Sequence, residues 1–346
     1  MEFSRRAGLL AAAAAVVLSA SACGADAAST ETATSPAASA AFPVTVGHVY
    51  GETTIEEQPQ RVATISWVNA DVSLALGVVP VGMALDTWGN NENGSTDWKD
   101  AKLDELGAAI GGDKAPAQYD ETDGVNFEEI AKLSPDVILA AYSGLTREDY
   151  DKLSKIAPVV GPVAANYTTS WQDATTTIGK ALGKTAEADA VVEDVDAQVA
   201  AVTEANPVLK ESSFIAGNLD PATNALSIYA GGDNRPRFLS ALGMTEAPVV
   251  AENAKEGEFY YTWAAERGNE LESDVFFTWL PAGTTNASIQ KHALFGQIPA
   301  VKDGGLVSIT DDQLTLAISA SSPLSLPWAL DEFTPLLVDA AEAAKN

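Results

Sequence analysis

The stretch KTAEADAVVEDVDAQVAAVTEAN, residues 184–206, contains neither glycine nor proline, and Pro207 follows it directly. Its larger apolar residues recur at intervals of four, four and three, at Val191, Val195, Val199 and Val202. This spacing places them along one stripe of an α-helix, which Pro207 ends. At 1.5 Å per residue the helix is about 35 Å long, comparable with the width of a small domain. It either lies on the surface of one domain or connects two.

The length and charge of the chain limit its architecture and its partners. With 346 residues, the chain is long enough for two domains that each have a hydrophobic core. Acidic residues outnumber basic ones by 48 to 20, which gives a formal net charge of −28. Nucleic acid and anionic membrane surfaces are therefore poor partners for the folded part of the protein.

The N-terminal segment predicts export and attachment to a membrane. Residues 1–22 have the composition of a signal peptide, with two arginines before an apolar run that is too short to span a bilayer. Small residues precede Cys23, as in bacterial lipoprotein signals, where this cysteine becomes the lipidated first residue. Residues 23–41 are rich in Ala, Ser and Thr and form a flexible tether. We expect a lipid-anchored protein at the extracytoplasmic face of the cell membrane; the alternative is a plain secretory signal.

Strand and helix patterns alternate on both sides of residues 184–206. Before this stretch we expect a short hairpin in VTVGHVYGETTIEEQPQ (44–60), strands at 61–65, 78–85, 136–140 and 158–160, and helices at 69–76, 127–133, 146–156 and 171–182. After it we expect strands at 213–217, 225–229, 274–279 and 306–309, and helices at 237–242, 292–295 and 327–345. Such alternation is typical of parallel α/β sheets. The sequence predicts an α/β fold with two Rossmann-like lobes, 42–183 and 207–346, joined by one long helix.

A local repeat supports two similar lobes. FEEIAKLSPDVIL (127–139) and AERGNELESDVFF (265–277) align without a gap. In each segment a glutamate, Glu128 or Glu266, stands eight residues before an Asp-Val pair that opens an apolar strand. We interpret the two segments as a duplicated helix–strand unit.

The residues for most catalytic sites are missing. The only histidines are His48 and His292, so a site of three histidines cannot form, and we expect no directly bound metal and no cofactor. The sequence contains no HExxH, GxSxG, P-loop or GxGxxG motif. Cys23 is the only cysteine, which excludes an internal disulfide, and its lipid would exclude it as a nucleophile. A binding protein is favoured over an enzyme; a surface hydrolase would need one of the two histidines as its base.

Aromatic side chains follow the predicted strands. They are Trp67, Trp88, Tyr142, Tyr167, Tyr229 and Trp279. Because ligands of parallel α/β sheets bind beyond the carboxyl ends of the strands, two facing lobes would form an aromatic cleft. Arg235 and Arg237, in the loop GGDNRPRF, suit an anionic or oxygen-rich ligand. The alternatives are local packing of each aromatic ring and salt bridges from the arginines to neighbouring carboxylates.

An ordered set of segments resembles the binding proteins of iron–siderophore ABC importers, the class III periplasmic binding protein fold. The segments are PQRVATISW (59–67), LALGVVPVGM (74–83), VNFEEIAKLSPDVILAAYSGLTREDYDKLSKIAPVV (125–160), WQDATTTIGKALGK (171–184), GGDNRPRFLSALG (231–243) and FGQIPAVKDGGLVSI (295–309). The resemblance implies a rigid connecting helix and a ligand cleft between the lobes. It assigns ligand contacts to the six aromatic residues and to Arg235, and less directly to Arg147, Arg237 and Trp263.

The resemblance also implies a ligand and a partner. The ligand would be a ferric siderophore that carries the iron itself, and the small number of arginines favours a hydroxamate or mixed type over a triscatecholate. The partner would be the permease dimer of an importer, docked through Glu128 and Glu266 on a monomeric binding protein. Cobalamin or haem capture by the same fold is the closest alternative, and an adhesion module is a more distant one.

Overall fold

The computed structural model describes residues 42–165, 167–255 and 258–345. The predicted signal peptide, the predicted lipid on Cys23 and the predicted tether lie outside these residues. Within them, no helix combines the length and the apolar character that crossing a bilayer requires.

The N-terminal lobe is built on a parallel sheet whose strand order reverses at its centre. The order is β5 (Ala117–Tyr119), β4 (Gly82–Ala84), β3 (Val62–Thr64), β6 (Val137–Leu139) and β7 (Val159–Val160). The helices are α1 (Val68–Ala75), α2 (Asp97–Glu105), α3 (Phe127–Lys132), α4 (Arg147–Leu153) and α5 (Trp171–Ala181). An antiparallel hairpin, β1 (Val44–His48) and β2 (Gly51–Ile55), precedes the sheet. Because β4 and β6 lie on opposite sides of β3, a crevice forms at the carboxyl ends of β3 and β6.

The C-terminal lobe has a mixed sheet. The path β11 (Tyr260–Trp263), β9 (Ala225–Tyr229), β8 (Ser213–Asp220), β12 (Val275–Trp279) and β13 (Leu306–Ile309) is joined by β10 (Thr245–Glu246) beside β8. The helices are α7 (Pro207–Lys210), α8 (Asn234–Ala241), α9 (Pro248–Asn253), η1 (Ala265–Glu270), α10 (Asn286–Gln290), η2 (Phe295–Gln297), α11 (Pro299–Lys302), α12 (Asp312–Ser319) and α13 (Ser325–Ala343). Strands β8, β12 and β13 are parallel, whereas β9 is antiparallel to both of its neighbours, β8 and β11. This lobe therefore only partly follows the predicted parallel pattern.

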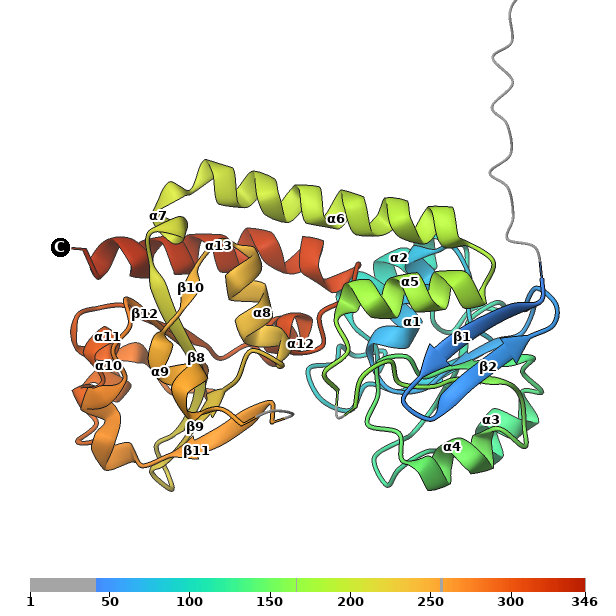
Figure 1. The fold of residues 1–346 in the computed structure, drawn as a ribbon, viewed down its shortest axis with the longest axis horizontal. Helices are drawn as coiled ribbons and strands as arrows, with labels where there is room; N and C mark the ends of the chain where they lie inside the picture. The colour runs from blue at the N-terminus through green and yellow to red at the C-terminus, as the bar shows by residue number, and fades with distance from the viewer. Residues whose placement is uncertain (1–41, 166, 256–257, 346) are drawn as a thin grey trace, which may run out of the picture. The chain divides into compact units, whose positions relative to one another are not determined.

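The long helix α6 (Thr185–Ala205) lies between the two lobes along the chain, as predicted. Its buried residues are Ala188, Val195, Val199 and Thr203, with Val191, Val192 and Val202 packed beside them. It packs against α5 of the N-terminal lobe and against α13 of the C-terminal lobe (Figure 1). Gly179 of α5 permits this contact, because a Cβ there would lie 2.3 Å from the side chain of Ala188. The helix is a connector between two lobes, which excludes the alternative of an ordinary surface helix.

The chain returns to the N-terminal lobe after β13. The Ser322 hydroxyl donates to Asp71 of α1 at 2.5 Å, and the Gln313 side chain accepts the Asp97 N–H at 2.6 Å. The rings of Trp98 and Trp328 lie 5.1 Å apart. These contacts, in addition to α6, fix the two lobes to each other.

One predicted helix is wrong, and several elements are missing from the sequence prediction. Residues 292–294 are not helical, and residue 295 only begins the short 3-10 helix η2; His292 lies between α10 and η2. Its Nδ1 accepts the backbone N–H groups of Leu294 and Phe295, which favours a turn there. The unpredicted elements are α2, β5, α7, β10, α9, β11, α10, α11 and α12. Most of them are short, and α2 lies partly in a stretch that reads as a polar loop.

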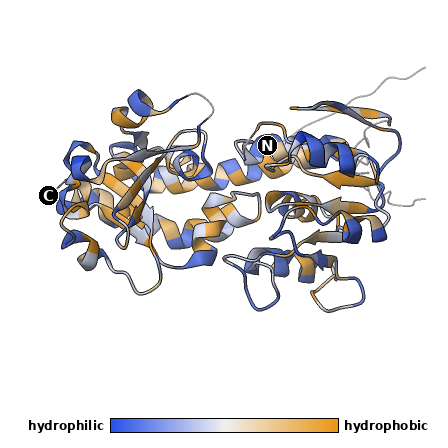
Figure 2. Ribbon diagram, turned by 90° about the horizontal axis from the view of Figure 1, so that it is seen from below, coloured by the Kyte–Doolittle hydropathy of each residue, from blue (hydrophilic) through white to orange (hydrophobic). Residues whose placement is uncertain are grey.

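The strands form the hydrophobic interior of both lobes. Figure 2 shows hydrophobic residues concentrated in the strands, while the helices alternate between hydrophobic and hydrophilic residues. Phe214, Phe276 and Phe277 of the C-terminal sheet are fully buried, as are Ile138 and Leu139 of β6. The polar ends of these strands are therefore the positions where the chemistry of a ligand site can be placed.

Candidate functional site

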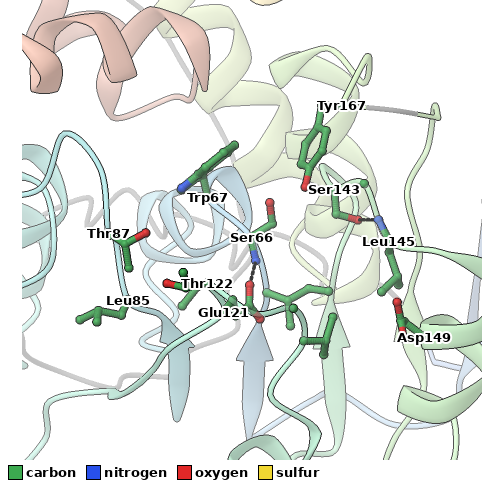
Figure 3. Close-up of a pocket in the computed structure, with 15 residues that line it drawn as sticks. Ser66, Trp67, Leu85, Thr87, Glu121, Thr122, Ser143, Leu145, Asp149 and Tyr167 are labelled. Atoms are coloured by element: carbon green, nitrogen blue, oxygen red, sulfur yellow. Dashed lines mark hydrogen bonds between the residues drawn. The ribbon is translucent and has the colours of Figure 1, made fainter.

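A cavity of about 440 Å³ opens at the carboxyl ends of β3, β4, β5 and β6, where the strand order reverses. Its lining residues include Ser66, Trp67, Leu85, Thr87, Glu121, Thr122, Ser143, Leu145, Asp149 and Tyr167 (Figure 3). Most of these are hydroxyl, aromatic or aliphatic side chains. The cavity lies where the sequence predicts ligand binding in a parallel α/β lobe.

Two side chains, the buried Asn69 and the partly buried Glu121, hold the strand ends that form the cavity. Asn69 donates from its Nδ2 to the carbonyls of Ile65 and Tyr142, and its Oδ1 accepts the Tyr142 N–H at 3.0 Å. It thereby joins the end of β3 to the end of β6. Ser66 has a φ of 60°, in the left-handed region, and its N–H donates to the Glu121 carboxylate at 2.9 Å. This turn directs Trp67 away from the sheet at the start of α1.

Three of the predicted aromatic residues form one cluster beside the cavity. The ring of Tyr167 lies 5.9 Å from that of Trp67 and 5.8 Å from that of Tyr142. Trp67 is 39% exposed and Tyr167 is 40% exposed, whereas Tyr142 is buried. Gly144 makes room for the Tyr167 ring, since a Cβ at that position would lie 2.4 Å from it. The two exposed rings present open faces to a ligand, and Tyr142 supports them.

A second cluster joins Trp88 of the N-terminal lobe to Tyr229, Arg235 and Trp279 of the C-terminal lobe. The ring of Trp88, 37% exposed, lies 6.0 Å from that of Trp279, whose indole N–H donates to the Tyr229 hydroxyl at 3.0 Å. The Arg235 guanidinium lies 3.5 Å from the centre of the Tyr229 ring. It also makes two hydrogen bonds to the Asp233 carboxylate, at 2.7 and 2.6 Å. Burial raises the pKa of Tyr229 above its ordinary value.

The start of α8 links the two clusters, because Asn234 contacts the first cluster and the next residue, Arg235, belongs to the second. Asn234, at the start of α8, donates to the Tyr142 hydroxyl at 3.0 Å and to the Ser319 carbonyl at 3.1 Å. Burial raises the pKa of Tyr142, and the nearby Asp233 adds to this effect. Tyr142 therefore stays protonated and neutral near neutral pH. The structure brings seven of the ten predicted ligand residues into these two linked clusters.

Three predicted ligand residues lie elsewhere. Arg147 pairs with Asp151 at 2.9 Å and donates to the Tyr50 carbonyl beside the β1–β2 hairpin. Trp263 is buried among the apolar residues of the C-terminal lobe, and its indole N–H donates to the Arg267 carbonyl. Arg237 borders a separate cavity of about 70 Å³ near α5 and α6, where no described group accepts from its Nη1.

Sequence reasoning missed Glu121, Asn69 and the hydroxyl residues of the cavity. Glu121 follows β5, a three-residue strand that the sequence pattern did not predict, so no strand end pointed to it. Asn69 reads as an ordinary first-turn residue of α1, because its partners come from distant parts of the chain. Within the described residues, no group of three His, Cys, Asp or Glu side chains could hold a metal ion.

The two glutamates of the local repeat occupy equivalent places in their lobes. Glu128 lies in the first turn of α3, which precedes β6, and Glu266 lies in the first turn of η1, which precedes β12. Both side chains are exposed. Glu128 pairs with Lys132 at 2.9 Å, and this hydrogen bond lowers the pKa of Glu128.

The chain is similar to proteins of known structure and name. The structure of PiaA from Streptococcus pneumoniae TIGR4 in complex with ferrichrome has a TM-score of 0.79 and 34% identity, covering 86% of this chain and 99% of that one. SirA of Staphylococcus aureus, complexed with staphyloferrin B, has a TM-score of 0.66 and 25% identity, covering 85% and 98%.

A relative from Bacillus subtilis (strain 168), whose name describes an ABC transporter substrate-binding lipoprotein, is 27% identical over 277 residues. The match covers 75% of this chain and 79% of the relative. Residues 62–313 match the model of the family described as periplasmic binding protein, which is a family of binding proteins and not of enzymes. With its two lobes and connecting helix, this chain belongs to the periplasmic binding protein family.

Proposed function

We propose that this protein captures a ferric siderophore and delivers it to the permease dimer of an ABC importer. The observation that carries the proposal is the pair of linked aromatic clusters at the strand ends, beside a cavity lined by hydroxyl groups. Exposed rings offer a large contact area with little loss of side-chain entropy. The relatives named with ferrichrome and with staphyloferrin B support iron–siderophore ligands as the class.

Within that class, a hydroxamate or mixed siderophore fits best. A triscatecholate complex of iron is strongly anionic and would need several free guanidinium groups. Here Arg235 is already paired with Asp233, and Arg147 is paired with Asp151 away from the clusters. A hydroxamate or mixed siderophore complex carries less negative charge and does not need several free guanidinium groups.

The proposal also includes a lipid anchor in the membrane, docking to the permease and a monomeric state. Cys23 carries the lipid, so Cys23→Ala should release the protein into the medium. Glu128 and Glu266, one exposed carboxylate in each lobe, orient the protein on a two-fold symmetric permease, and the protein acts as a monomer.

Fluorescence titration tests the ligand assignment. Ferrichrome should quench tryptophan emission in a saturable manner, and iron-free ferrichrome should quench it less. The double variant Trp88→Phe, Trp279→Phe should lose much of the quenching. Trp263→Phe, in the core of the C-terminal lobe, is the matched control and should keep it. Saturable binding of cobalamin, with no quenching by any ferric siderophore, would overturn the proposal in favour of the alternative cargo.

A visible absorption spectrum distinguishes haem capture from siderophore binding. Haem iron needs an axial ligand such as histidine or tyrosine. The hydroxyls of Tyr142 and Tyr229 already accept hydrogen bonds from Asn234 and Trp279. We therefore expect no Soret shift of the kind that axial ligation produces when haem is added.

A further inference from the structure

The charged side chains that line the cavity are all acidic. Glu121 and Asp149 are the only charged side chains among its lining residues, and none of the described lining residues is Lys or Arg. Asp149 is partly neutralised, because Lys152 lies 3.4 Å from it and the Thr146 hydroxyl donates to it. Glu121 is therefore the carboxylate whose charge the cavity does not balance.

The Glu121 carboxyl group is held at the floor of the cavity. One oxygen accepts the Ser66 N–H at 2.9 Å, and the other is buried with no hydrogen-bond partner among the described groups (Figure 3). Burial raises the pKa of Glu121 to about 7, and the Ser66 hydrogen bond only partly opposes this effect. No described donor offsets the charge of this buried oxygen, so the carboxylate keeps an uncompensated negative charge beside the cavity.

The groups that face this carboxyl supply no compensating cation. Tyr119 precedes it on β5, and its hydroxyl is already donated to the Thr64 carbonyl. Tyr167 and Asp149 border the same cavity. A ligand that carries a positive charge or a hydrogen-bond donor at this point would be attracted to the Glu121 carboxylate. A ligand that carries a negative charge there would be repelled.

We propose that Glu121 makes this cavity select ferric complexes that present an ammonium or another hydrogen-bond donor, and disfavour complexes that present negative charge. This inference rests on the proposed function, because it assigns a charge preference to the same site. Glu121 acts here as a specificity-determining residue that no sequence pattern marks. It also holds the Ser66 turn, and therefore the start of α1 that carries Trp67.

A pair of ligands that differ in one charge tests the inference. Ferrioxamine B carries a free terminal ammonium, and its N-acetyl derivative keeps the same iron centre without that charge. Wild-type protein at pH 8 should bind ferrioxamine B about tenfold more tightly than the acetylated form, the range for one charge-assisted hydrogen bond. A ferric triscatecholate should bind more weakly than both.

The variant Glu121→Gln assigns the preference to this residue. Glutamine keeps an acceptor for the Ser66 N–H but removes the charge, so the two ferrioxamines should bind equally. Glu129→Gln is the matched control, because it changes the net charge by the same amount from the exposed face of α3, and it should keep the preference. Equal affinities in the wild type, or a preference that survives in Glu121→Gln, would overturn the inference.

The two proposals fail separately. If no ferric siderophore binds the wild type, the proposed function fails. If both ferrioxamines bind with the same affinity, only the role of Glu121 fails. If Glu121→Gln folds poorly, the pH dependence of the wild type decides: the preference for ferrioxamine B should weaken as Glu121 is protonated below about pH 7, and an unchanged preference would overturn the inference.

Discussion

The Ser322 hydroxyl donates a hydrogen bond to the buried carboxylate of Asp71 at 2.5 Å, across 251 positions of the chain. Asp71 also accepts the Trp98 indole N–H at 2.7 Å and lies 4.0 Å from Lys99. Burial raises the pKa of Asp71 to about 6 even with these partners. A turn near the C-terminus is thus part of the polar interior of the N-terminal lobe.

Ser322→Ala should lower the stability of the whole described unit. It removes a hydrogen bond to a buried carboxylate and leaves that group with fewer donors, which costs about 2–3 kcal/mol. Urea unfolding measures the effect. Ser321→Ala is the control, because Ser321 is also buried but donates only to the Ile318 carbonyl of its own turn. Equal losses in the two variants would show that Ser322 does not fix the lobes together.

Arg235→Ala should reduce both ligand binding and stability. The structure pairs Arg235 with Asp233, and both side chains are largely buried, so the variant leaves a buried carboxylate without its cation. We expect a stability loss of about 3 kcal/mol, together with weaker ferrichrome binding. Arg267→Ala breaks the same kind of contact, to Glu270 at 2.5 Å, on an exposed surface. That control should cost far less stability than Arg235→Ala, because solvent screens an exposed ion pair. Normal stability of Arg235→Ala would contradict the structural part of this prediction.

The stability of the protein should fall between about pH 4.5 and pH 7 through Glu121. The pKa of this carboxyl rises from 4.5 to about 7 on folding, mainly because of burial. The folded state therefore binds the proton more tightly, and its ionisation penalises folding as the pH rises through this window. The full pKa shift corresponds to a loss of about 3 kcal/mol in the free energy of unfolding.

Urea unfolding at several pH values checks this effect. Between about pH 4.5 and pH 7, the free energy of unfolding should decrease less with rising pH in Glu121→Gln than in the wild type. Glu272→Gln, at an exposed position, should reproduce the wild-type slope. Parallel profiles for the wild type and Glu121→Gln would rule out a contribution from Glu121.

The double variant Glu128→Ala, Glu266→Ala should bind ferrichrome normally in solution but fail to support uptake in cells. Both carboxylates are exposed and lie outside the cavity lining, so their loss leaves the ligand site intact. Iron uptake at matched surface abundance is the measurement. The double variant Glu129→Ala, Glu272→Ala removes two neighbouring exposed glutamates and should transport normally. Normal uptake by the first variant would exclude the docking role.

Small-angle scattering should show nearly the same radius of gyration with and without ferrichrome. Helix α6 packs on both lobes, and the Ser322 and Gln313 contacts hold a second point between them. A large decrease on binding would mean that these contacts open and close, which the geometry opposes.

The long connecting helix could be predicted because its signal is local. An unbroken helical stripe from Val191 to Val202 and a proline stop need no knowledge of the rest of the chain. The strand ends could be predicted in the same way, and with them seven aromatic and arginine positions of the two clusters.

The polar details of the site depend on contacts between distant segments. Asn69 binds Tyr142, 73 positions further along the chain, and Glu121 reaches Ser66 over 55 positions. No periodicity encodes such pairs. Arg147 and Arg235 show the same limit, because the nearby carboxylates Asp151 and Asp233 occupy their guanidinium groups, and an acidic chain offers too many candidate partners to choose between them.

Helix α6 and the Ser322 turn both hold the two lobes together. This limits how many copies of the binding protein, here the receptor, are useful to a cell. If filling the cavity changes the outline of the protein very little, a permease that contacts only Glu128 and Glu266 meets the same surface on filled and unfilled copies. The unfilled copies then compete for the same docking sites. Uptake would follow the fraction of receptors that carry cargo rather than their total number, and overproduction of the receptor when iron is scarce would slow transport.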